Sequence, residues 1–172
     1  MGIVADLGIR PVSRAWPARS VRWFAATRFG AWALHRPLPY LDRGMRAVSR
    51  GRTTVSDLLG GAPTIFLTTT GARTGQPRTA QLIAVPEGED LIVIGSNFGR
   101  ARAPSWVSNL AADPHAVAAH GRRAVRVIAA EVVGDEAARA LTAAADHYRG
   151  FATYQGMVTG RVIRVFRLRS DP

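Results

Sequence analysis

The chain of 172 residues is long enough for one domain of ordinary size and too short for two independent catalytic domains. Its 47% hydrophobic and 20% charged residues exclude wholesale disorder, and its lack of cysteine excludes a disulfide scaffold, a cysteine nucleophile and thiolate metal sites. The net charge of +11, in which every basic residue is an arginine, indicates an anionic partner: nucleic acid, a membrane surface or a highly charged small molecule.

The positive charge is concentrated near the N-terminus, where residues 1–60 carry a net charge of +7 against +4 for residues 61–172. Hydrophobic patterning predicts helices over residues 19–35 and 40–50. The second helix has an apolar stripe opposite three arginines. Such a stripe is typical of a helix that packs on the core and exposes its charges. The alternative is a basic helix lying on an anionic bilayer.

Membrane insertion and secretion are not indicated by the sequence. There is no uninterrupted apolar stretch of the roughly 20 residues that a transmembrane helix needs, and no secretory signal pattern at the N-terminus. We therefore expect a cytoplasmic protein in which residues 1–57 form a basic helical extension. Peripheral contact of this extension with the inner face of the cell membrane is a hypothesis that its charge suggests.

The rest of the chain, residues 58–172, has the pattern of a single β-rich domain. Strands are predicted over Thr64–Thr70, Arg78–Val85, Leu91–Ser96, His115–His120, Ala124–Val133 and Arg161–Leu168. Helices are predicted from Pro104, at the first helical position, to Ala112, and from the N-cap Asp135 to Tyr148. Because the connections between strands are short, they favour antiparallel pairing. The predicted fold class is α+β, with six strands curled into a barrel.

The sequence offers no obvious acid–base or nucleophilic machinery. The four histidines, His35, His115, His120 and His147, show no metal-ligand spacing, so we expect no metal site. The G-x-S-x-G, Rossmann and P-loop fingerprints are absent.

Arginines on glycine-rich turns are the most informative polar feature. Arg73 lies within the turn 71–76 and Arg78 follows it, while Arg100 and Arg102 lie in the loop 97–103. Glycines let the backbone approach an anion closely, free N–H groups in such turns bind phosphate oxygens, and arginine adds bidentate contacts. These segments predict an anion site, and ordinary surface turns with solvated arginines are the alternative.

Three sequence motifs resemble the deazaflavin (coenzyme F420)-dependent nitroreductase and quinone reductase family across residues 58–170. They are Leu67–Thr79 (LTTTGARTGQPRT), the run Ser96–Gly99 (SNFG) with Ala103–Leu110 (APSWVSNL) and Ala112–Pro114, and the weaker piece Tyr148, Phe151, Tyr154 and Gln155. The resemblance implies a split β-barrel of the flavin-reductase-like superfamily. It also implies binding of coenzyme F420, a deazaflavin whose tail carries a phosphodiester and several glutamates.

The resemblance also implies roles for individual residues. The cofactor-binding residues would be Gly71, Arg73, Thr74, Gly75 and Arg78 at the phosphate and tail, Gln81 and Leu82 along the deazaflavin, Ser96, Asn97 and Gly99 near the ring, Arg102, and Trp106 packed beside the cofactor. The acceptor would lie against Tyr148, Phe151 and Tyr154. Ser96, Tyr148 and Tyr154 would be the catalytic residues. For Trp106 and for the aromatic residues after 147, core packing is the alternative.

The implied reaction is hydride transfer from reduced F420 to an organic acceptor such as a quinone or a nitroaromatic compound. Phe151 stands where the family often has tyrosine, and it cannot donate a hydrogen bond to a nitro or quinone oxygen. Two alternatives stay open. One is a split-barrel oxidoreductase that uses FMN, and the other is a non-enzymatic protein that binds anionic surfaces. Nucleic acid is not expected as a partner, because no recognition helix or aromatic stacking pattern is present.

Overall fold

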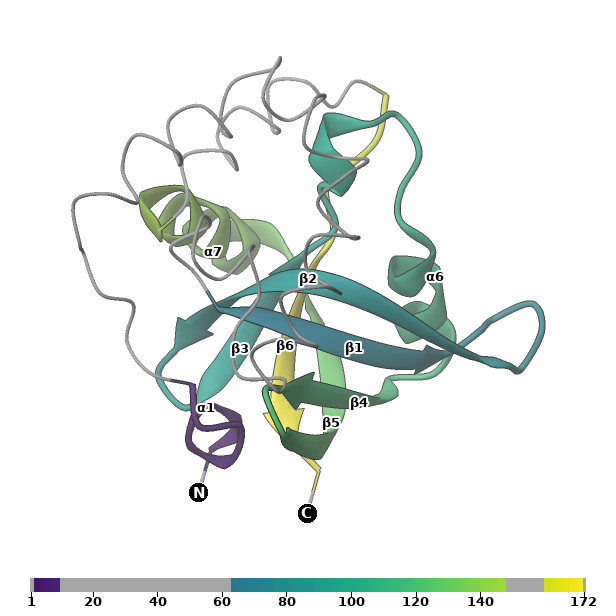
Figure 1. Ribbon diagram of the computed structural model, residues 1–172. Helices are drawn as coiled ribbons and strands as arrows, with labels where there is room; N and C mark the ends of the chain where they lie inside the picture. The colour runs from purple at the N-terminus through teal and green to yellow at the C-terminus, as the bar shows by residue number, and fades with distance from the viewer. Residues whose placement is uncertain (1, 10–62, 148–159, 172) are drawn as a thin grey trace.

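The computed structural model describes residues 2–9, 63–147 and 160–171, drawn in colour in Figure 1. The strands are β1 (Thr64–Thr70), β2 (Pro77–Glu87), β3 (Asp90–Ile94), β4 (His115–His120), β5 (Arg123–Val132) and β6 (Val165–Ser170). The helices are α1 (Ile3–Asp6), the 3-10 turn η1 (Asn97–Gly99), α6 (Ser105–Ala112) and α7 (Gly134–His147). The helices predicted over residues 19–35 and 40–50 lie outside the described residues.

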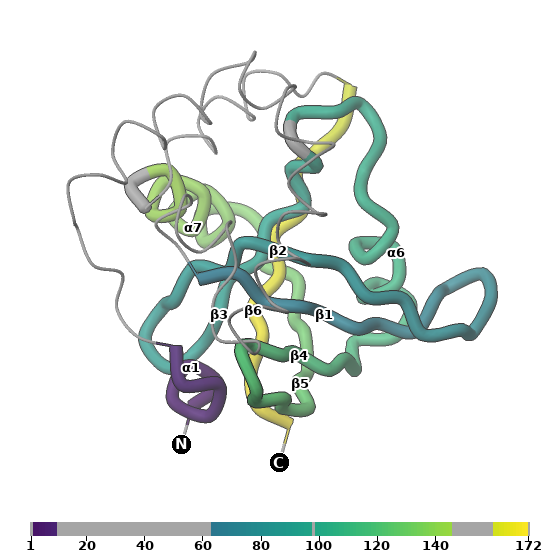
Figure 2. The backbone as a smooth tube through the Cα atoms, in the orientation of Figure 1, coloured from purple at the N-terminus to yellow at the C-terminus, as the bar shows by residue number. Residues whose placement is uncertain are grey.

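The six strands form one closed antiparallel barrel in the order β1-β2-β3-β6-β5-β4 (Figures 1 and 2). β1 closes the barrel because it pairs with β2 on one side and with β4 on the other. Three of the five connections, β1–β2, β2–β3 and β4–β5, are hairpins or short loops, as antiparallel neighbours allow. This arrangement confirms the predicted α+β class and the six-stranded barrel.

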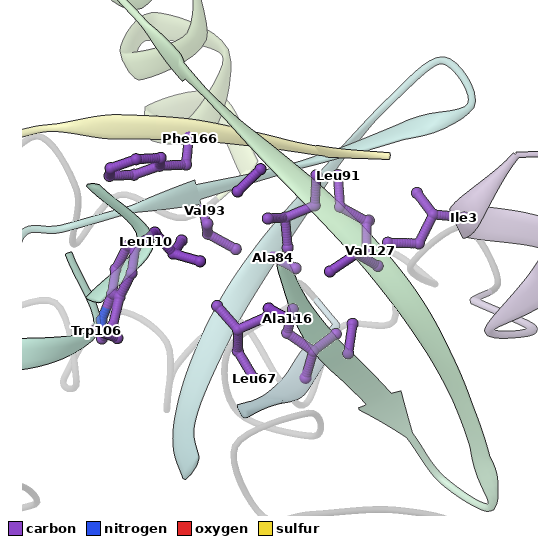
Figure 3. Packing of buried hydrophobic residues seen from close by; sticks show 14 of the residues in the cluster. Ile3, Leu67, Ala84, Leu91, Val93, Trp106, Leu110, Ala116, Val127 and Phe166 are labelled. Atoms are coloured by element: carbon purple, nitrogen blue, oxygen red, sulfur yellow. The ribbon is translucent and has the colours of Figure 1, made fainter. Parts of the chain in front are cut away.

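Alternating side chains fill the inside of the barrel. In β1, Ile65 and Leu67 are fully buried while the residues between them are partly exposed, which is the period of two that a half-buried strand shows. Phe166 of β6 and Trp106 of α6 lie at one end of this interior and Ile3 at the other, as Figure 3 shows. The interior is therefore a packed core rather than an open channel.

A second apolar cluster covers the outside of the barrel under α7. β3 is apolar on both faces: Leu91 and Val93 point into the barrel, and Ile92 and Ile94 pack in the cluster that includes Ala140 and Ala144 of α7. Arg167 of β6 adds ion pairs across this face, with Glu87, Asp90 and Glu136. This two-sided burial explains why β3 is a continuous hydrophobic run.

The first residues of the chain close the end of the barrel that lies beside the β2–β3 turn. Ile3 and Leu7 are fully buried in the interior cluster. The backbone N–H of Val4 donates to the carbonyl of Glu89, and Arg123 donates to the carbonyls of Ala5 and Asp6 at the C-terminal end of α1. Residues 2–9 are thus part of the barrel core, a role that the sequence analysis did not assign to them.

The predicted bounds of four strands, β2, β3, β5 and β6, differ from the structure. β3 ends at Ile94 rather than Ser96, and β5 runs one residue earlier than predicted at both ends. β2 continues through Pro86 to Glu87, beyond the predicted end at Val85, and residues 88–89 form the turn. The register of β2 with β1 ends at Ile83, so Pro86 lies on a stretch that pairs with β3 alone, where a missing N–H is tolerated. β6 begins at Val165 rather than Arg161, and Arg161 instead donates hydrogen bonds to the loop after β3.

The predicted helix starts are each wrong by one residue. Pro104 is the N-cap of α6 rather than its first helical residue, and its carbonyl accepts from the N–H of Val107. α7 begins at Gly134, so Asp135 lies in the first turn and not at the N-cap. An acidic residue in the first turn still interacts favourably with the positive end of the helix dipole.

The ion pair between Arg164 and Glu131 gives a pH-dependent prediction. Two hydrogen bonds from Arg164 lower the pKa of Glu131 below its usual 4.5. Because the pKa is lower in the folded protein, the pair stabilises the fold above about pH 4.5 and loses this effect as the pH falls through the folded-state pKa. We expect Glu131→Gln to lower the free energy of unfolding by about 0.5 kcal/mol at pH 7 and by less near pH 3. Urea denaturation at both pH values measures this, and an equal difference at the two would contradict it.

Candidate functional site

The turn between β1 and β2, residues 71–76, holds its own backbone in place. The N–H of Gly71 donates to the carbonyl of Gln76, and the N–H groups of Thr74 and Gly75 both donate to the carbonyl of Gly71. The N–H of Gln76 donates to the hydroxyl of Thr74, 3.3 Å away. Because these N–H groups are already used within the turn, they are not available to an anion. Anion binding at this turn falls to the side chains.

Gly71 and Gly75 allow this turn for different reasons. A Cβ on Gly71 would lie 2.8 Å from Thr74 Oγ1 and 3.0 Å from the carbonyl oxygen of Gln76, so only glycine fits inside the turn. Gly75 has a φ of +65°, a left-handed conformation that glycine adopts without strain. The glycines therefore shape the turn that carries Arg73.

Arg73 is exposed on this turn, and Arg78 is exposed at the start of β2. Among the residues that the structure describes, neither of them makes an ion pair. Arg164, Arg167 and Arg169, in contrast, are each held by a carboxylate. Arg102, in the loop before α6, is also exposed. Arg73, Arg78 and Arg102 are therefore available to an anionic ligand, whereas the arginines near β6 serve the fold.

The side chain of Asn109, on α6, holds the turn 71–76 in place through two hydrogen bonds. It is 5% exposed, its Oδ1 accepts from the N–H of Ala72 at 3.0 Å, and its Nδ2 donates to Thr69 Oγ1 at 2.9 Å. The hydroxyl of Thr69 in turn donates to the carbonyl of Arg78. One buried amide thus positions the backbone on both sides of Arg73. We did not predict this role, although a polar residue on the buried stripe of a short helix is a signal for it.

We expect Asn109→Leu to lower the free energy of unfolding by about 2–3 kcal/mol. The leucine has a similar size, but it leaves the N–H of Ala72 and the hydroxyl of Thr69 without their partner. Urea denaturation measures the loss. Ser108→Ala, at the neighbouring exposed position of α6, is the control and should change stability by less than about 0.5 kcal/mol. A similar small change in both variants would show that the amide contacts do not stabilise the turn.

The loop after β3 brings together the residues that the resemblance placed near the reactive ring. Ser96 is buried, and its carbonyl accepts from the N–H of Gly99. Asn97 has a φ of 48°, unusual for a residue with a side chain, and its Nδ2 donates to the carbonyl of Arg102 at 2.8 Å. The loop is closed on itself before it enters α6, which packs beside β1 (Figure 2).

The remaining predicted cofactor residues lie on β2 and α6. Gln81 and Leu82 are half-buried, and Leu82 packs against the interior cluster. Trp106 is 4% exposed and meets Phe166 edge-to-face, with ring centroids 5.8 Å apart. The core-packing interpretation of Trp106 is thus confirmed. Its proposed place beside a cofactor stays a prediction.

The predicted acceptor residues Tyr148, Phe151 and Tyr154 lie outside the described residues, so their arrangement stays a prediction. Within the described ranges, no three His, Asp or Glu side chains gather as metal ligands would. His115 instead pairs with Asp113, and the hydrogen bonds from His115 lower the pKa of that carboxyl. No helix in the described part of the chain has the length and apolar character needed to cross a membrane.

Comparison with known proteins agrees with this geometry. An F420H(2)-dependent quinone reductase of Mycobacterium tuberculosis is 42% identical over 55 residues, a match that spans 32% of this chain and 37% of that protein. A second protein of that organism, named for the same activity, is 33% identical over 109 residues, covering 62% of this chain and 89% of its own. The solved F420-H2 dependent reductase FDR-A is 32% identical with a TM-score of 0.56, over 62% of this chain and 93% of its own. Because the family model described as F420H(2)-dependent quinone reductase also matches residues 43–169, the chain belongs to that family.

Proposed function

We propose that this protein is an oxidoreductase that transfers a hydride from reduced coenzyme F420 to a quinone-type acceptor. The observation that carries the proposal is the family match over residues 43–169, which includes the rigid turn with Arg73 and the loop that enters α6. The FMN and anionic-surface alternatives have no comparable support.

The residues present fit the anionic tail of F420. A phosphodiester and glutamate carboxylates need exposed cations that no protein carboxylate neutralises, and Arg73 and Arg78 meet this need within the described residues. The hydroxyl of Thr74 accepts from the N–H of Gln76, so its own proton is free to be donated to a phosphate oxygen. Arg102 would bind the outer part of the tail. Gly71 and Gly75 keep the turn in the shape that presents these groups.

At the ring, the proposed roles are positioning and exclusion of water. When bound, F420 in its reduced form supplies the hydride. Gln81 and Leu82 would line one side of the ring, and Ser96, Asn97 and Gly99 would border its reactive edge. Because Ser96 is buried, this edge would face a site of low water content. Trp106 would support the ring from within the core.

The acceptor would lie against three aromatic side chains. Tyr148 and Tyr154 would orient the acceptor and donate a proton to its oxygen, while Phe151 would provide apolar surface only. A quinone is flat and apolar and suits such a site. Because Phe151 has no hydroxyl, we expect turnover of nitroaromatic compounds to be weaker than turnover of quinones.

Fluorescence titration of the purified protein with coenzyme F420, with FMN in parallel, tests the proposal. We expect saturable F420 binding, weaker or absent FMN binding, and oxidation of reduced F420 that depends on added quinone. Binding of FMN alone would transfer the proposal to the flavin alternative. Absence of both would leave the barrel as a binding fold, and salt-sensitive association with anionic vesicles would then favour the anionic-surface alternative.

A peripheral membrane contact through residues 10–57 is part of the same proposal, since quinones reside in bilayers. It does not involve residues 2–9, which are packed in the barrel. Co-sedimentation with vesicles that contain anionic lipid measures this membrane contact. The full chain is compared with a variant in which four arginines of residues 36–52 are replaced by glutamine. Equal binding of both proteins would disprove the contact.

A further inference from the structure

Arg161 binds three backbone carbonyls of the loop after β3. Its Nη1 donates to the carbonyl of Gly95 at 3.0 Å and its Nη2 to that of Ser96 at 2.8 Å. The carbonyl of Arg100 accepts from both Nη2, at 3.0 Å, and Nε, at 3.2 Å. The guanidinium therefore lies at the centre of residues 95–100, more than sixty positions away from them along the chain.

Because the N–H groups of Arg161 bind backbone carbonyls, Arg161 supports the loop of residues 95–100 and does not act as an anion ligand. A guanidinium has five N–H groups in a planar fork, and four contacts to carbonyl oxygens occupy most of them. Arg73 and Arg78 are exposed and differ from it in this respect.

The loop's own hydrogen bonds are short in range. Gly99 donates to Ser96, Arg100 donates to Asn97, and the side chain of Asn97 donates to Arg102, all within five positions. Such bonds close the loop but do not fix it on the barrel. Arg161 joins both ends of the closed unit to the segment that leads into β6, next to the backbone bond from Gly95 N–H to the carbonyl of Arg164.

We infer that Arg161 is a positioning residue for hydride transfer: it holds Ser96, Asn97 and Gly99 in place at the ring edge of the site. The inference rests on the proposed function and deepens it, because it names the residue that sets the geometry of the predicted catalytic loop. A misplacement of about 1 Å at a reacting centre lowers rates by up to about a hundredfold, so such a support is essential to turnover.

Three variants separate positioning from general stability. Arg161→Met removes all the contacts, and Arg161→Lys retains a cation that reaches fewer carbonyls, because an ammonium has no fork. Arg164→Met is the matched control. Arg164 lies three residues further on and is also doubly hydrogen-bonded, but to the Glu131 carboxylate rather than to the loop.

The first measurement is amide hydrogen exchange by NMR in the cofactor-free protein. The N–H groups of Gly99 and Arg100 are hydrogen-bonded within the loop and report on it, while those of Thr74 and Gly75 report on the distant turn. In Arg161→Met we expect exchange at Gly99 and Arg100 to be about tenfold faster, with Thr74 and Gly75 unchanged. Arg161→Lys should lie between wild type and Arg161→Met, and Arg164→Met should match wild type.

The second measurement is steady-state kinetics with reduced F420 and a water-soluble quinone. We expect kcat to fall at least about tenfold in Arg161→Met with the KM for quinone nearly unchanged, to recover partly in Arg161→Lys, and to stay at the wild-type value in Arg164→Met. Wild-type exchange and wild-type kcat in Arg161→Met would overturn the inference. So would equal effects in Arg161→Met and Arg164→Met, which would indicate a general loss of stability.

Failure of the proposed function gives a different result. In that case the wild-type protein itself does not bind F420, and the catalytic purpose assigned to Arg161 is rejected with it. The exchange experiment needs no cofactor, so it still decides whether Arg161 holds the loop. If the wild type binds F420 and only the Arg161 effects are missing, the inference alone is wrong.

Discussion

The double variant Arg73→Ala/Arg78→Ala is expected to bind coenzyme F420 at least about 100-fold more weakly than the wild-type protein. Each arginine is exposed and makes no ion pair with the described part of the chain, so its removal breaks contacts to the ligand and leaves the fold unchanged. A charge-assisted hydrogen bond contributes about 1.5–3 kcal/mol, and we take the lower end for each side chain because solvent screens exposed charges. Fluorescence titration measures the dissociation constant.

Salt dependence gives a second measure of the same contacts. The affinity of the wild-type protein should fall as ionic strength rises, because the tail of F420 is strongly anionic. The double variant should show a shallower dependence, since two of the contacting cations are gone. Its unfolding temperature should remain within about 2 °C of the wild-type value, as expected for exposed side chains.

The matched control for the change in net charge is Arg122→Ala/Arg126→Ala. Both arginines are exposed on the β4–β5 hairpin, and Arg122 lies in the turn at the end of the barrel away from Arg73. We expect the control to weaken F420 binding less than about threefold, through long-range electrostatics alone. If the two double variants weaken binding equally, the positive field of the protein attracts the cofactor and the turn does not bind it. If neither does so, Arg73 and Arg78 are not cofactor ligands.

The barrel was predictable from the sequence because its strands are regular. β1 and β4 were predicted with correct boundaries, since β-branched or alternating residues are bounded by glycine or proline on short turns. The pairing of β1 with β4, which closes the barrel, joins strands far apart in the sequence. In the sequence, only the number of short antiparallel strands suggested that a barrel would close. Pro86 is typical of a turn, but its pairing with Leu91 of β3 keeps it in the strand. Asp135 is typical of an N-cap, but α7 begins one residue earlier, at Gly134.

The candidate site was predictable where it depends on side chains in a motif. Arg73, Arg78 and Ser96 were named from the sequence because they stand in recognisable runs. Asn109 stands in such a run too, but its role required knowing that α6 packs beneath the turn. Arg161 gave no signal, because its partners are backbone carbonyls that every residue possesses. Supports of this kind become visible only when the fold is known.

The role of residues 2–9 was likewise not predictable. Ile3 and Leu7 form only a two-residue apolar pattern at i and i+4, too short for a confident helix. They are buried because the barrel has an open end beside the β2–β3 and β4–β5 turns, and α1 fills it. Ser170, at the end of β6, donates from its hydroxyl to the carboxylate of Asp6 at 2.7 Å. The beginning and the end of the described chain thus meet at this end of the barrel (Figure 1).

Leu7→Ala is therefore expected to lower the free energy of unfolding of the whole barrel by about 2–5 kcal/mol, the range for removing a buried leucine side chain. Leu7 is 1% exposed and lies in the same cluster as Leu91, Val127 and Leu168, so the cavity would form inside the barrel. Urea denaturation followed by tryptophan fluorescence measures the change. Ala5→Ser, at the exposed position of α1, is the control and should cost less than about 0.5 kcal/mol.

Hydrogen exchange separates a core element from a surface attachment. If α1 is part of the cooperative core, Leu7→Ala accelerates exchange in β3, β5 and β6 together, because all of them open by global unfolding. If α1 only covers the barrel, exchange rises within residues 2–9 alone and the unfolding free energy changes little. F420 binding at the distant turn should be unaffected under conditions in which the variant is folded, since Arg73 lies at the opposite end of β1 from the hairpin that contacts α1. Residues 2–9 would then be assigned to the barrel domain and not to the basic extension.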